Sequence, residues 1–134
     1  MERMRRRAPL AADAGSAVAE FVMVVSLLTV LTLSVMQLAL ALHIRNTVLD
    51  AAAEGARFAA LADTGPDDGA ERTRDLITAA LGRSYATDVR AGFGRFAGQR
   101  TVEVRVAVPL PLIGLLGPGH GLEVVGHAAL EGLD

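Results

Sequence analysis

The feature that most constrains this chain is a long uncharged run near its start. From Phe21 to Leu42 there are 22 residues, and none of them is Asp, Glu, Lys or Arg. A helix rises about 1.5 Å per residue, so this run covers ~33 Å, enough to cross a hydrocarbon core of about 30 Å. Val, Leu and Met occupy the run without leaving a polar face for water. We therefore expect a membrane-spanning helix over about residues 21–42.

The charges on either side of this run predict its orientation. Four arginines precede it, whereas Arg45 is the only arginine in the first turns after it; the preceding ones are Arg3, Arg5, Arg6 and Arg7. The positive-inside rule therefore predicts a single-pass protein of the cell membrane, with a cytoplasmic N-terminus and an extracytoplasmic C-terminal part. A removed secretory signal is the alternative, but its apolar core has about 7–15 residues and this run is longer.

The composition limits the chemistry that the rest of the chain can perform. The 134 residues contain no cysteine, which excludes a disulfide framework and a thiolate site, and the net charge of −2 is too small to indicate nucleic acid as a partner. His43, His120 and His127 lie in three different contexts, and no glycine-rich phosphate motif occurs. We expect no enzyme activity, no cofactor or metal ion and no small-molecule substrate.

The residues before the uncharged run carry a family resemblance. Gly15 is followed by Ser16, and Glu20-Phe21 stand directly before the aliphatic helix. This arrangement resembles the type IV prepilin processing site. More specifically, residues 16–62 resemble the TadE-like minor pilins, or pseudopilins, of tight-adherence (Tad) pili. Their start is commonly Gly-Ser-x-x-Val-Glu-Phe, and a later Ala-x-x-Gly-Ala-Arg segment corresponds here to Ala53-Glu54-Gly55-Ala56-Arg57.

The resemblance implies a function in assembly. A prepilin peptidase would cleave between Gly15 and Ser16, and the mature protein would join other pilin subunits and the Tad machinery in a pilus for adhesion or secretion. Glu20 becomes the acid at the fifth mature position, followed by Phe21. The family commonly has Pro six residues after this Glu, whereas this chain has Ser26, so no kink is expected there. The alternative is an uncleaved single-pass anchor whose extracytoplasmic domain binds a protein partner.

A role for Glu20 can also be argued from its charge, independently of the resemblance. Cleavage would give Ser16 a free amino group, which is largely cationic near neutral pH. A carboxylate at the membrane edge is costly unless it is paired or wet. In a packed fibre the amine of a neighbouring subunit can supply the partner of Glu20 and set the axial register. The alternative is that Glu20 is simply solvated among the lipid headgroups.

Three further residues are candidates for helix packing. Ser26 and Gln37 are eleven residues apart, about three turns, so they point nearly the same way and can bond to a neighbouring helix. The alternative for Ser and Thr in this run is a bond back to the preceding turn. Gly55 lies in a stripe of small residues on the extension of the helix beyond the membrane. That stripe packs either on helices of other subunits or on the chain's own C-terminal domain.

The pattern predicts an α+β protein in three parts. A leader over residues 1–15 precedes a transmembrane and extended helix over residues 16–62, and a small domain with a short helix and an antiparallel β-hairpin or small sheet occupies residues 63–134. Within the domain, Asp63 to Gly69 is expected to be a solvated turn and Ala70 to Leu81 a helix that stops at Gly82.

The last third of the chain contains the clearest strand signal. Thr101 to Val108 alternates strictly, with four valines on one face, and Leu122 to Leu130 is its expected antiparallel partner. Gly92, Gly94 and Gly98 indicate a loop before this strand. The connection from Pro109 to Gly121 is unusually apolar, and its leucines can cover the domain core, touch the membrane or contact another pilin.

Overall fold

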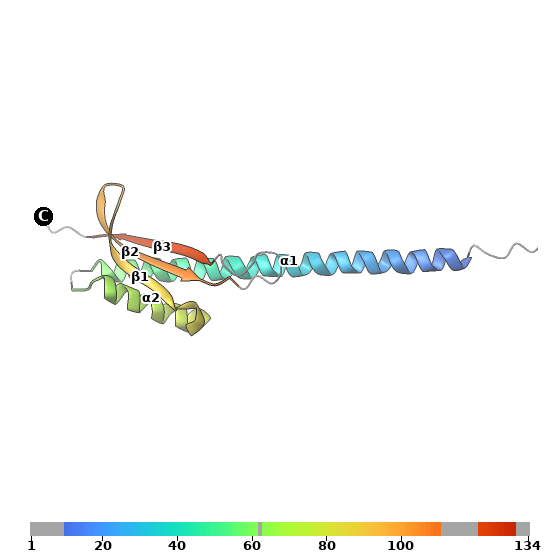
Figure 1. Cartoon of the computed structure of the whole chain (residues 1–134). Coiled ribbons are helices and arrows are strands. Elements are labelled where there is room, and N and C mark those ends of the chain that lie inside the picture. Colours follow the sequence, from blue (N-terminus) through green and yellow to red (C-terminus); the bar gives the residue numbers. More distant parts are fainter. Residues whose placement is uncertain (1–9, 62, 111–120, 131–134) are drawn as a thin grey trace, which may run out of the picture. The chain divides into compact units, whose positions relative to one another are not determined.

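The computed structural model describes residues 10–61, 63–110 and 121–130. Figure 1 shows the elements, which in chain order are α1 (Leu10–Ala59), α2 (Pro66–Leu81), a short 3-10 helix η1 (Arg83–Tyr85), β1 (Asp88–Phe96), β2 (Gln99–Val108) and β3 (Leu122–Ala129). The predicted fold class is confirmed: a long apolar helix, then a short helix and an antiparallel sheet. The chain divides into two compact units, residues 1–38 and 39–134, and α1 contributes residues to both.

Helix α1 differs at both ends from the predicted range of 16–62. It begins at Leu10, because Ala and Leu at residues 10–14 are strong helix formers and a single Gly15 does not stop them. It ends at Ala59, where the hydroxyl of Thr64 donates to the carbonyl oxygens of Phe58 and Leu61. These bonds satisfy carbonyl groups that the end of a helix leaves without intrahelical partners.

Helix α2 starts four residues earlier than the sequence predicted. The expected solvated turn over Asp63–Gly69 is wrong in its second half, because Pro66 occupies the first helical position, where its missing N–H costs nothing. The carboxylate of Asp68 accepts a hydrogen bond of 2.8 Å from the backbone N–H of Gly65, which fixes the start. The predicted stop is confirmed: Gly82, with φ of 100°, ends the helix.

The loop predicted around Gly92 and Gly94 is in fact strand β1. It pairs with β2 in antiparallel register, with Phe96 opposite Gln99, and the two residues between them have positive φ: Ala97 at 50° and Gly98 at 83°. Such a turn matches the twist of a tight hairpin. Gly94 belongs in the strand because the side chain of Glu103 occupies the space in which a Cβ would lie. The sheet therefore has three strands in the order β1-β2-β3.

The central strand β2 carries much of the hydrophobic core. Its four alternating valines are 0–1% exposed, as the sequence predicted for one face; they are Val102, Val104, Val106 and Val108. β3 runs antiparallel to β2, with Val124 opposite Val106, which confirms the expected pairing. Full burial of each valine side chain contributes roughly 1.5–3 kcal/mol, so this strand alone accounts for a large share of the stability of the domain.

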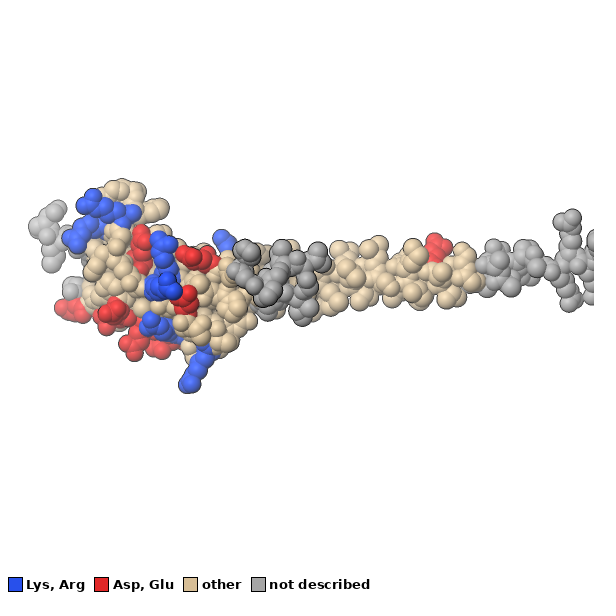
Figure 2. All heavy atoms as spheres, in the orientation of Figure 1, with Lys and Arg blue, Asp and Glu red and all other residues tan. Residues whose placement is uncertain are grey.

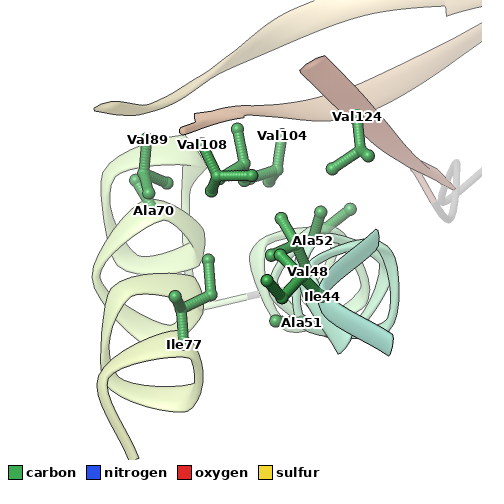
Figure 3. Packing of buried hydrophobic residues seen from close by; sticks show 12 residues of the cluster. Ile44, Val48, Ala51, Ala52, Ala70, Ile77, Val89, Val104, Val108 and Val124 are labelled. Carbon is green, nitrogen blue, oxygen red and sulfur yellow. The ribbon is translucent and has the colours of Figure 1, made fainter. Parts of the chain in front are cut away.

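Both helices pack on this apolar face of the sheet within residues 39–134. Figure 3 shows Ile77 of α2 and Ile44 and Val48 of α1 pointing towards the valines of the strands. Ile44 is 2% exposed, and Val48 and Ile77 are 0% exposed. The recurrence of apolar residues at three- and four-residue steps along α1 is thus explained by burial in the chain's own domain.

The contact between β3 and α1 is close enough to exclude a side chain. A Cβ on Gly126 would overlap the backbone of Ala52 and Ala53 in α1. On the opposite face of the sheet, Gly92 has nothing within 4 Å of the same position. The two glycines are therefore a matched pair, one required by packing and one not.

We predict that Gly126→Ala lowers the free energy of unfolding of the domain by about 1–3 kcal/mol, the usual cost of overpacking. Gly92→Ala should be neutral or slightly stabilising, because Ala loses less backbone entropy than Gly in a strand. The single Tyr, half-buried against the core, gives a fluorescence signal for urea unfolding of the full chain in detergent, and the protein has no Trp to obscure it. Equal losses in both variants would contradict the packing argument.

Candidate functional site: the N-terminal helix

The predicted processing site lies on an exposed part of α1. Gly15 and Ser16 are both exposed, and nothing outside the helix lies within 4 Å of the position where a Cβ on Gly15 would stand. Phe21 is 68% exposed. The bond between Gly15 and Ser16 is therefore accessible but sits inside a helix, so a peptidase would have to unwind this turn to cleave it. The roles of Gly15, Ser16 and Phe21 stay predictions.

Glu20 has no ion pair with any residue that the structure describes. It lies four residues after Ser16, which places it on the same face of α1 one turn further on. Its carboxylate is exposed, so solvent, lipid headgroups or another molecule must supply its partner. Figure 2 shows it as the one acidic side chain on the otherwise uncharged surface of this part of α1. Its role in assembly stays a prediction.

The large apolar side chains of residues 15–38 are exposed in the part of the chain that the structure describes. Between Val18 and Leu38 they are 43–71% exposed, with Val25 at the low end and Met23 at the high end. Each such side chain favours burial by roughly 1.5–3 kcal/mol, so this surface is not stable in water. α1 is the one described helix that is long and apolar enough to cross a membrane. The protein therefore has the form of a single-pass membrane protein.

The hydroxyl groups in the span bond within their own helix. Ser26 donates to the carbonyl oxygen of Val22 at 2.7 Å, and three further residues make the same four-residue bond at 2.8 Å, namely Thr29, Thr32 and Ser34. The alternative of a bond back to the preceding turn is thus the one observed for Ser26. The helix also continues unbroken through Ser26, as expected for a chain without Pro there.

Gln37 behaves differently from Ser26. It is half-buried, and its side-chain amide makes no hydrogen bond to the described residues. An amide has two donor hydrogens and one acceptor oxygen, so Gln37 keeps more capacity for a neighbouring helix than any hydroxyl of the span. Its part in helix packing stays a prediction.

Gly55 packs on its own chain. It is buried against α2, where a Cβ would overlap the hydroxyl of Thr73 and stand 2.6 Å from the carbonyl oxygen of Gly69. The reverse holds for Gly69, whose Cβ would stand 2.6 Å from the carbonyl oxygen of Gly55. Of the two alternatives for the small-residue stripe, the structure shows packing on the chain's own C-terminal domain. Within this chain, the small residues allow α1 and α2 to cross at backbone distance.

Thr73 ties the two helices together at this crossing. It is 0% exposed, and its hydroxyl lies 2.8 Å from the carbonyl oxygen of Gly69 and 3.3 Å from that of Ala51. The second contact joins α2 to α1. A buried hydroxyl without such partners would cost about 1–3 kcal/mol, so Thr73 fits this position because both acceptors are present.

The outer face of the sheet carries the polar groups of the domain. The guanidinium of Arg105 lies between the carboxylates of Glu103 at 3.4 Å and Glu123 at 3.3 Å. His127 stacks on Phe96 with ring centroids 5.0 Å apart, and its Nδ1 lies 3.7 Å from Glu103. The sequence analysis missed this network, although the alternation of Glu103 and Arg105 with buried valines signalled an exposed charged face.

These groups do not form a metal centre. Over residues 10–61, 63–110 and 121–130, no three His, Cys, Asp or Glu side chains gather as metal ligands would. His43 is exposed on α1, and His120 lies outside the described residues. The Glu54–Arg57 pair, which the three-residue spacing suggests, is present at 3.8 Å on the surface of α1. The apolar segment 111–120 also lies outside the described residues, so the alternatives for its contacts stay open.

The N-terminal helix has a counterpart among known families. Residues 15–57 match the family model described as TadE-like protein. The match begins at the predicted processing glycine and ends at the arginine of the Ala53–Arg57 segment, so it covers the two motifs from which the resemblance was inferred. That resemblance is confirmed. No curated protein and no solved structure matches the chain.

We predict that Gly55→Ala destabilises the domain by about 1–3 kcal/mol, although Ala is the better helix former. Removing the clashing hydroxyl in Gly55→Ala/Thr73→Ala should not restore stability, because the backbone oxygen of Gly69 still obstructs the new methyl group. Urea unfolding followed by the fluorescence of Tyr85 measures both variants. Full recovery in the double variant would show that the obstruction comes from the side chain alone.

Proposed function

We propose that this chain is a minor pilin of a Tad-type pilus, because its residues 15–57 match the model of the TadE-like family. The observation that carries the proposal is the coincidence of the family match with an apolar helix whose side chains lack partners in the single chain. The precursor is inserted in the cell membrane, processed by prepilin peptidase and then built into the pilus. Its role is structural rather than catalytic, and the pilus serves adhesion or secretion.

The charges around the span support the orientation. Four arginines lie before it and one directly after it, which favours a cytoplasmic N-terminus and an extracytoplasmic domain. Prepilin peptidase acts on the cytoplasmic side, where this orientation places Gly15. The same orientation puts residues 63–134 outside the membrane, where they meet other pilin subunits and the assembly machinery.

The exposed side chains of the span support transfer from lipid to a fibre. Their surface is equally apolar in both settings, so extraction does not require new polar contacts for most residues. What changes is the surroundings of Glu20, which leaves the headgroup region for a drier fibre core. The free amino group of Ser16 on a neighbouring subunit is the partner we assign to it there.

A second candidate function is an uncleaved anchor that holds the domain at the membrane surface, where it binds a protein partner. The observation that favours it is the continuity of α1 from Leu10 through Gly15, since the predicted cleavage bond lies within a helix. The two functions differ in the N-terminus of the working protein.

We predict that the protein extracted from membranes of a strain with active prepilin peptidase begins at Ser16, as measured by intact mass and N-terminal peptide mapping. Gly15→Leu should retain residues 1–15, whereas Ala17→Leu, a matched change at another exposed position of the same helix, should still be cleaved. The space around Gly15 makes loss of folding an unlikely cause of a block. An intact leader in the parent protein would support the anchor instead.

For Glu20, we predict that Glu20→Gln is processed normally but enters the pilus at least about tenfold less, because the desolvated amine loses its counter-charge. Glu20→Asp keeps the charge and should recover part of the incorporation. The measurements are mass spectrometry for cleavage and quantitative immunoblots of sheared pili for incorporation. Equal incorporation of Glu20→Gln and the parent would contradict the pairing and leave Glu20 as a solvated headgroup residue.

A further inference from the structure

The end of the β1–β2 hairpin carries two arginines that have no ion pair with another described residue. Arg95 and Arg100 are directly opposite each other in the register of the two strands, and both are exposed. Neither forms an ion pair with a residue in the described ranges, whereas Arg57, Arg90 and Arg105 each have a carboxylate within 4.0 Å. Like charges at directly opposed positions destabilise a sheet. An acidic surface placed against the two arginines would relieve this repulsion.

Exposed aromatic rings flank these arginines. Phe93 is 65% exposed and Phe96 is 59% exposed, although every other large apolar side chain of the three strands is buried or half-buried. We call Phe93, Arg95, Phe96 and Arg100 the hairpin end. Figure 2 shows its positive charges gathered over the hairpin, apart from the acidic side chains near the start of α2. Cationic and aromatic groups together fit an acidic surface that also offers apolar contact.

The same unit of the chain contains a surface of the opposite kind. Asp63 and Asp67 are exposed at the connection between α1 and α2 and have no cationic partner in the described part of the chain. Phe58 in the last turn of α1 is 38% exposed, and Leu61, just after the helix, is 58% exposed. We call these four residues the acidic turn. The acidic turn therefore combines apolar side chains with negative charge, whereas the hairpin end combines apolar side chains with positive charge.

We propose that the hairpin end of one copy of this chain binds the acidic turn of a second copy. Within residues 39–134 both surfaces lie at the end where α1 meets α2 (Figure 1). The contact joins two different surfaces, so it repeats from copy to copy instead of closing as a symmetric dimer.

This proposal goes beyond a role in the pilus and does not depend on cleavage at Gly15, so its test and the test of processing fail separately. The absence of cysteine allows single reporters to be placed in the full chain. Gln99→Cys marks the hairpin end and Leu61→Cys marks the acidic turn, and neither change removes a charge. The two variants are given tags of different size, expressed together in membranes and oxidised.

The expected result is a mixed disulfide between the Gln99→Cys and Leu61→Cys copies, in clear excess over either self-pair. Adding Arg95→Glu/Arg100→Glu to the first copy should lower this cross-link at least tenfold, and Asp63→Arg/Asp67→Arg on the second copy should restore it. Arg83→Glu/Arg90→Glu changes the net charge equally at exposed positions away from the hairpin end, and it should leave the cross-link unchanged.

Two outcomes would overturn the proposal. One is a cross-link that forms equally well in the Arg95→Glu/Arg100→Glu variant, because charge complementarity would then play no part. The other is self-pairing of Gln99→Cys in place of the mixed product, which would indicate a symmetric contact through the hairpin ends. If the Arg95→Glu/Arg100→Glu variant keeps the cross-link but melts at a lower temperature, the two arginines are paired within their own chain. This result is a special case of the first outcome and also contradicts the proposal.

Discussion

The structure depends on backbone-distance packing around the last third of α1. Gly55 and Gly69 let the two helices cross at backbone distance, and Gly126 lets β3 lie on the backbone of α1 at Ala52. Close packing of this kind tolerates no added methyl group, and it holds α2 and the sheet to one arrangement. The valines of β2 then fill the space between the helices and the strands.

The same packing depends on small side chains, and these occupy only the C-terminal part of α1. The domain buries the side of α1 that faces it between Ile44 and Ala59, where the residues are mostly Ala and Gly. Before Leu42 the residues become bulky, and the large apolar side chains of residues 18–38 are left exposed. A sheet can approach a helix at backbone distance only where the side chains are small. The change from Val and Leu to Ala and Gly along α1 therefore marks the change from the candidate membrane span to the part of the helix that is buried in the chain's own core.

The sequence predicted the elements whose signal is local and regular. The uncharged run predicted the span, and the alternation from Thr101 to Val108 predicted the central strand with its buried face. It failed at β1, because Gly92 and Gly94 are typical of loops, whereas the pairing that makes them part of a strand is with residues of β2 across the sheet. Residues from three strands and two helices meet in the core, and spacing along one element cannot show which of them touch.

For the candidate site, too, the sequence predicted residues from their order along the chain but not their contacts in the fold. Gly15, Glu20 and the segment around Gly55 were found from their order along the chain, and all of them lie within the range that matches the family model. The partner of Gly55 was not, because Thr73 lies 18 residues further on, in a different helix. The hairpin end went unnoticed for a similar reason. Arg95 and Arg100 become neighbours only once Phe96 and Gln99 are known to be paired.

If the span moves from lipid to a contact with neighbouring helices, its apolar side chains contribute little free energy to that association. A leucine in lipid and a leucine against a neighbouring helix are both out of water, so moving the span from one to the other gains mainly packing. Specific association must then come from groups that the single chain leaves without partners. In the span this group is Glu20, and in the domain it is the pair Arg95 and Arg100, none of which has an ion pair with another described residue. Polar contacts are directional, so contacts through such groups would fix the register between neighbours, which an apolar helix surface alone cannot do.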